Sequence, residues 1–61
     1  MKKADLLDLL EKMEKNERGI AKAFSGKRVG EDARNRADEI CIIRMILTDK
    51  DFAADMAKIY G

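Results

Sequence analysis

The fold of this chain is decided by the stretch Ile40-Cys41-Ile42-Ile43-Arg44-Met45-Ile46-Leu47, in which seven of the eight residues are apolar. Such a run stands out in a chain where charged residues make up 41% of the sequence. A helix with one buried face carries apolar residues at i, i+3, i+4 and i+7 rather than at nearly every position. We therefore expect this apolar octet, residues 40–47, to be covered on more than one side.

A strand is the alternative interpretation of the apolar octet. Four of its residues are β-branched and favour strands, namely Ile40, Ile42, Ile43 and Ile46. The residues before it indicate a helix instead, because 31–39 contain no Gly or Pro and show no alternation of apolar and polar residues. Ala33 and Ala37 also precede Ile40 at helical spacing. We predict one central helix from Glu31 to Leu47.

The residues before the central helix predict a first helix from Lys3 to Ser25. Its apolar positions alternate in spacings of four and three, with one polar interruption, through Leu6, Leu10, Met13, Glu17, Ile20 and Phe24. Gly19 lies inside this helix, where glycine costs about 1 kcal/mol relative to alanine. It marks either a bend or a close approach of another helix, and we favour the close approach.

Residues 25–30 form the one clear break in the helical pattern. Gly26 suits the left-handed conformation that follows many helix ends, and Gly30 or its neighbour suits the start of the next helix. A loop this short makes the two long helices an antiparallel hairpin. After Leu47, Thr48 is predicted to cap a third helix from Asp49 to Tyr60, with Asp51 at its third position.

Length and composition predict a single all-α domain over residues 1–61 that self-associates. A chain of 61 residues builds only a marginal core, and its one cysteine and lack of histidine argue against an internal disulfide or a zinc site. No apolar run reaches the ~18 residues of a membrane span, and residues 1–3 lead directly into an amphipathic pattern. We expect a cytoplasmic helical-bundle homo-oligomer, with a dimer favoured, that does not associate with membranes.

The interface of this oligomer is predicted on the side of the apolar octet that the hairpin leaves uncovered. Its candidate residues come from the octet and from the apolar face of the third helix, and they are Ile42, Met45, Ile46, Cys41, Phe52 and Met56. Arg44 lies inside the octet and has two interpretations. It either extends its charge to the surface from the edge of the core or forms a buried pair with Glu17.

The sequence argues against an enzyme and against a cofactor. Catalysis needs a nucleophile with a base, paired carboxylates or a metal, and the chain has no histidine. Ser25 and Thr48 lie at predicted helix ends, and Cys41 lies among apolar residues, where thiols are generally inert. Residues 47–61 resemble the opening of a helix-turn-helix, but the sequence stops before a recognition helix, so we do not expect DNA binding of that type.

Basic residues gather around the predicted hairpin turn. The candidates for an anion site are Lys22, Lys27, Arg28, Arg34 and Arg36. They form either a solvated end of the hairpin or a site for phosphates of nucleic acid or a nucleotide. We predict a small non-enzymatic interaction protein, a regulator, inhibitor or adaptor of a kind common in phages and mobile elements, that binds a protein partner. The alternative is an anion-binding module at the basic end of the hairpin.

Overall fold

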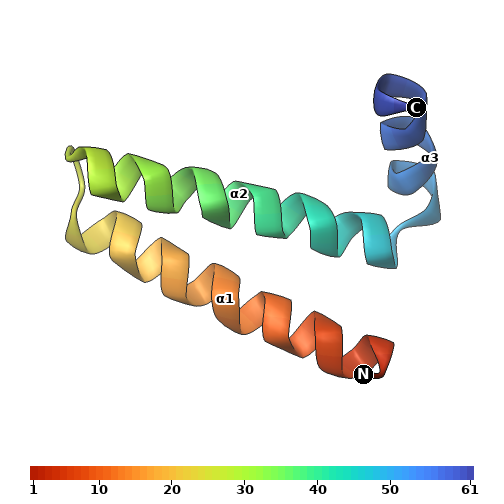
Figure 1. The fold of residues 1–61 in the computed structure, drawn as a ribbon, viewed down its shortest axis with the longest axis horizontal. Helices are drawn as coiled ribbons and strands as arrows, with labels where there is room; N and C mark the ends of the chain where they lie inside the picture. Colours follow the sequence, from red (N-terminus) through yellow and green to blue (C-terminus); the bar gives the residue numbers. More distant parts are fainter.

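The computed structural model describes all 61 residues, and its only regular secondary structure is α-helix. The helices are α1 (Lys3–Ala23), α2 (Arg28–Thr48) and α3 (Lys50–Tyr60). Helices α1 and α2 run antiparallel, and α3 rises from the far end of α2 on the side away from α1 (Figure 1). The all-α class, the antiparallel hairpin and the short third helix predicted from the sequence are confirmed.

The hairpin is held together along a narrow seam. Helix α2 contributes its buried residues at alternating spacings of three and four, namely Gly30, Ala33, Ala37 and Ile40. Helix α1 contributes Leu10 and Glu14. The predicted seam residues Met13 and Phe24 are instead each 45% exposed, so the prediction is wrong for both. The seam runs one residue further round α1 because Glu14 turns into the hairpin and forms ion pairs there.

The turn between α1 and α2 depends on two glycines. The Lys27 amide donates to the carbonyl oxygen of Phe24 over 3.0 Å, and Gly26 lies in this turn with φ of 81°, as predicted for a left-handed residue. Gly30 lies close to the end of α1, because a Cβ there would collide with the carbonyl oxygen of Phe24. Helix α2 begins at Arg28, three residues before the predicted start.

The junction between α2 and α3 is a single residue. Asp49 caps α3, and its carboxylate accepts hydrogen bonds from the amides of Asp51 and Phe52 at 3.0 and 3.1 Å. Thr48 was the predicted cap, but it is the last residue of α2, and its hydroxyl donates to the carbonyl oxygen of Arg44. The prediction was off by one residue because α2 continues as far as Thr48.

The three helices form one layer rather than two. No helix lies in front of another in a view down the shortest axis of the molecule (Figure 1), whose extents are 35, 27 and 14 Å. Helix α3 packs on α2 alone and has no buried residue. At Gly19, no atom lies within 4 Å of the position that a Cβ would occupy, so the predicted close approach does not occur within the chain. Both broad faces of the layer therefore remain open.

Candidate interaction surfaces

One face of the hairpin, the ion-pair face, carries a cluster of charged side chains around Glu14. The Glu14 carboxylate accepts a hydrogen bond of 2.9 Å from Arg18 Nε. Arg18 Nη2 also lies 3.5 Å from Asp38 Oδ1. Arg44 Nη2 lies 3.1 Å from Glu14 Oε1, but without the alignment of a hydrogen bond. The hydrogen bond to Glu14 is the main cause that raises the pKa of Arg18. Two cations thus compensate one buried carboxylate.

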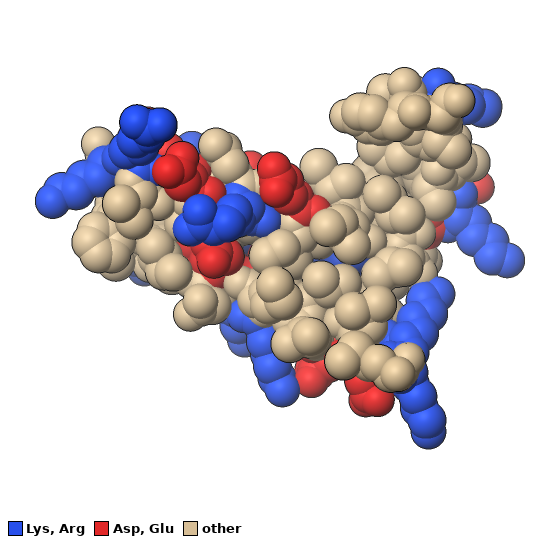
Figure 2. Space-filling model, in the orientation of Figure 1, with Lys and Arg blue, Asp and Glu red and all other residues tan.

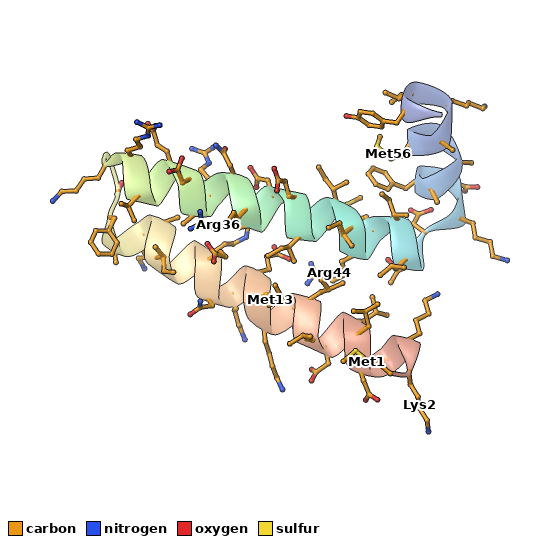
Figure 3. All side chains as sticks on the ribbon, viewed as in Figure 1. Met1, Lys2, Met13, Arg36, Arg44 and Met56 are labelled. Atoms are coloured by element: carbon orange, nitrogen blue, oxygen red, sulfur yellow. The ribbon has the colours of Figure 1, made fainter.

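These contacts correct the predicted buried pair of Glu17 and Arg44. Arg44 pairs with Glu14, whereas Glu17 accepts a hydrogen bond of 2.9 Å from Arg36 Nε. Both arginines reach from α2 toward α1 (Figure 3). Residues 14 and 17 lie about 60° apart around a helix, so their carboxylates leave the seam on opposite sides. The sequence predicted that Arg44 is ion-paired across helices as one alternative, but the partner was wrong.

The opposite face of the hairpin is mostly apolar, and we call it the hairpin face. Helical spacing from the seam and the position of Glu17 and Arg36 place eight residues on it: Leu6, Leu9, Met13, Ile20 and Phe24 of α1, with Val29, Ile43 and Leu47 of α2. Leu9, Met13, Phe24, Val29 and Ile43 are each at least 44% exposed. An area without charged side chains extends over the open half of the hairpin, where Met13 lies (Figures 2 and 3).

A second apolar surface, which we call the α3 side, lies on α2 away from α1 and continues onto α3. Its exposed residues are Ile42, Ile46 and, at its edge toward the ion-pair face, Met45 of α2, with Ile59 and Tyr60 of α3. Phe52 and Met56 are half-buried, and Met56 lies on the side of α3 that faces back over α2 (Figure 3). Five of the six predicted interface residues therefore belong to the α3 side. The sixth, Cys41, is half-buried and lies one residue after the seam position Ile40.

The predicted anion site is divided between different parts of the structure. Arg36 is paired with Glu17 on the hairpin face, away from the turn. The other candidates are exposed and form no ion pair, namely Lys22, Lys27, Arg28 and Arg34. Basic side chains are visible at the turn end of the hairpin, with acidic side chains close by (Figure 2). A shallow hollow there contains Arg34 but also Glu31.

Sequence reasoning missed the hairpin face as a candidate surface, although a signal for it was present. The widened apolar stripe of α1 includes Leu9 and Met13 beside the seam residue Leu10. A single neighbouring helix covers an apolar arc of about 100° on the helix it packs against. The stripe on α1 is wider than that, so α2 covers only part of it. The excess width of the stripe therefore indicated a second packing surface.

Other kinds of site find no support in the structure. No cluster of three or more Cys, Asp or Glu side chains is arranged to hold a metal ion. None of the three helices combines the length and apolar character needed to cross a membrane. The open hollow between the ends of the hairpin is lined by Ala4, Leu7, Asp8, Glu11, Arg44 and Thr48. The Thr48 hydroxyl in this hollow donates to the carbonyl oxygen of Arg44.

Comparisons with known proteins found no match. The chain matches no protein-family model, and it shows no significant similarity to a curated protein or to a solved structure.

Proposed function

We propose that this chain is a small non-enzymatic interaction protein, a regulator, inhibitor or adaptor that acts by binding a protein partner. The observation that carries the proposal is the amount of apolar surface left open. Eleven large apolar side chains are between 38 and 90% exposed, while only six of 61 residues are buried. A chain of this kind gains stability from binding, because each large apolar side chain contributes about 1.5–3 kcal/mol when fully buried.

The α3 side is the surface that we assign to this partner. Ile59 and Tyr60 are 66% and 85% exposed at the end of a helix that packs on α2 alone. Aromatic side chains surrounded by smaller apolar groups are typical anchors of protein interfaces. Asp55 and Lys58 on the same helix supply a polar rim of both charges. A partner that offers an apolar groove or helix face fits this surface better than a polar ligand does.

The test is a capture experiment with matched variants. Four chains are immobilised: the wild type, Ile59→Ser, Tyr60→Ser and a control variant, Asn35→Ser. The host proteins that bind to each chain are identified by mass spectrometry. We expect a protein that binds wild type and Asn35→Ser but is lost with Ile59→Ser and Tyr60→Ser. The captured protein is then purified, and its affinity for the same four chains is measured by calorimetry. Equal binding to all four, or no specific binding, would contradict the proposal.

Anion binding at the turn is the second candidate, favoured by the unpaired basic side chains Lys22, Lys27, Arg28 and Arg34. The structure weakens this candidate because Arg36 points its charge to Glu17 and Glu31 lies beside Arg34. Repeating the capture at higher salt separates the two functions. Phosphate binding falls steeply with salt, whereas apolar recognition persists.

A further inference from the structure

We propose that the hairpin face is covered by a second copy of this chain, with two hairpins packed face to face as a four-helix bundle. The proposal rests on the proposed function in one respect, since both require that the exposed apolar surfaces are binding surfaces. It differs from the sequence prediction in its residues. The self-association surface contains Leu9, Met13 and Ile43, while Ile42 and Met45 on the α3 side remain open to another protein.

The first argument is the missing second layer. Stable domains pack two layers of secondary structure around one core. Here α1 packs only on α2, and α3 lies beyond α2 in the same layer (Figure 1). The largest buried apolar side chains are Leu10 and Ile40, and no large side chain is fully buried. A second hairpin laid on the hairpin face would supply the missing layer.

The second argument is the area that remains exposed. The chain of 6.9 kDa has an accessible surface of 4988 Å², whereas a compact monomer of this mass exposes about 4,000 Å². Its radius of gyration is 13.3 Å, whereas about 10.5 Å is usual for this length. The excess of about 1,000 Å² per chain is close to the ~800 Å² that each partner buries in a standard interface.

The third argument identifies a second copy as the occupant. The charged residues at the centre of the hairpin face are one acid and one base, Glu17 and Arg36, which pair with each other. Two identical faces related by a two-fold axis therefore bring no unpaired charges of the same sign together at their centres, and the carboxylates of Asp32 and Glu39 lie at the α2 edge. Arg36 uses Nε for Glu17 and keeps half of its side chain exposed, so its terminal nitrogens are free to donate to a second chain. Asp32 and Glu39, at the α2 edge of this face, would supply acceptors.

Nuclear magnetic resonance of mixed samples tests the proposal without changing the sequence. Four methionines report on different places, because Met13 lies on the hairpin face, Met45 on the α3 side, Met56 on α3 and Met1 at the terminus. Chains with labelled methionine methyl groups are mixed with unlabelled chains, and only contacts between chains are recorded. We expect such contacts at Met13 and none at Met45, although the two are similarly exposed, at 45% and 38%. The reverse pattern would overturn the proposal.

Sedimentation equilibrium of matched variants is the second readout. We expect wild type and Met45→Glu to sediment at twice 6.9 kDa. Met13→Glu should weaken the dimer at least 100-fold, because it places a carboxylate in the interface. A wild-type chain that stays at 6.9 kDa at high concentration would overturn this inference alone. A wild-type chain that is dimeric but captures no specific protein would overturn the proposed function alone.

Discussion

The two halves of the hairpin are packed in different ways. In the turn half, the facing residues are small, namely Ala21, Gly30, Ala33 and Ala37, and the two backbones come into direct contact. In the open half, Leu7, Leu10 and Ile40 hold the helices apart, and the helices diverge toward their far ends (Figure 1). The cluster of Glu14 with Arg18 and Arg44 lies between the two halves.

This difference shows which part of the structure the chain completes by itself. Small residues let the turn half close fully, and Ala33 and Ala37 are both 0% exposed. The open half has the larger apolar side chains but leaves most of them half-buried or exposed, because α3 turns away from α1. Burial in the open half is thus the part that we propose another chain completes. Substitutions in the two halves should therefore differ in effect, even where the chemical change is small.

The largest effect is expected from Gly30→Ala, which adds a single methyl group in the turn half. The added Cβ would collide with the backbone carbonyl of Phe24 and lie 3.2 Å from that of Ala21. Backbone atoms cannot move aside as a flexible side chain does, so the helices must separate. We expect a loss of about 3 kcal/mol in the free energy of unfolding. The measurement is urea denaturation followed by circular dichroism at one fixed chain concentration, since self-association would make stability concentration-dependent.

A smaller loss is expected from Leu7→Ala in the open half, although this change removes three carbon atoms. Leu7 is half-buried and borders the open hollow near Arg44. Full burial of a leucine contributes about 1.5–3 kcal/mol, so we expect a loss of about 1 kcal/mol. The same denaturation series gives the result. If Leu7→Ala were more damaging than Gly30→Ala, the turn half would not be the better-packed half.

The parts of the fold that depend on local sequence were predictable. Apolar periodicity placed the three helices, and Gly26 was correctly assigned a left-handed conformation because few other residues adopt it. The exact start of α2 at Arg28 was not predicted, because glycine disfavours helix interiors and Gly30 was therefore placed at the start of the helix, although Val29 and Gly30 precede Ala33 at helical spacing. The cap of α3 was misplaced by one residue, since Thr48 and Asp49 are both good capping residues and only the length of α2 decides between them.

The arrangement of the surfaces was less predictable, because it depends on how far each helix is rotated about its axis. The apolar spacing favoured Met13 over Glu14 as a seam residue. The general rarity of buried carboxylates favoured it too. Glu14 is buried because Arg18 from its own helix and Arg44 from α2 both approach it, and the second contact is long-range. Moving the seam by one residue turns Met13 outward. This rotation creates the hairpin face that the sequence did not predict.

The smallest effect, and the only gain, is expected from Gly19→Ala in α1. Nothing lies within 4 Å of the position that its Cβ would occupy, so the methyl group meets no obstacle in the chain. Alanine loses less conformational entropy than glycine in a helix, and the free energy of unfolding should rise by about 0.5–1 kcal/mol. Gly30→Ala is the matched control, because the same substitution is made where the backbones touch. A loss of stability with Gly19→Ala, measured by urea denaturation, would mean that a second chain approaches α1 closely at this residue. Since Gly19 points about 180° away from Leu10 around α1, the second copy would then lie on the outer side of α1 instead of on the hairpin face.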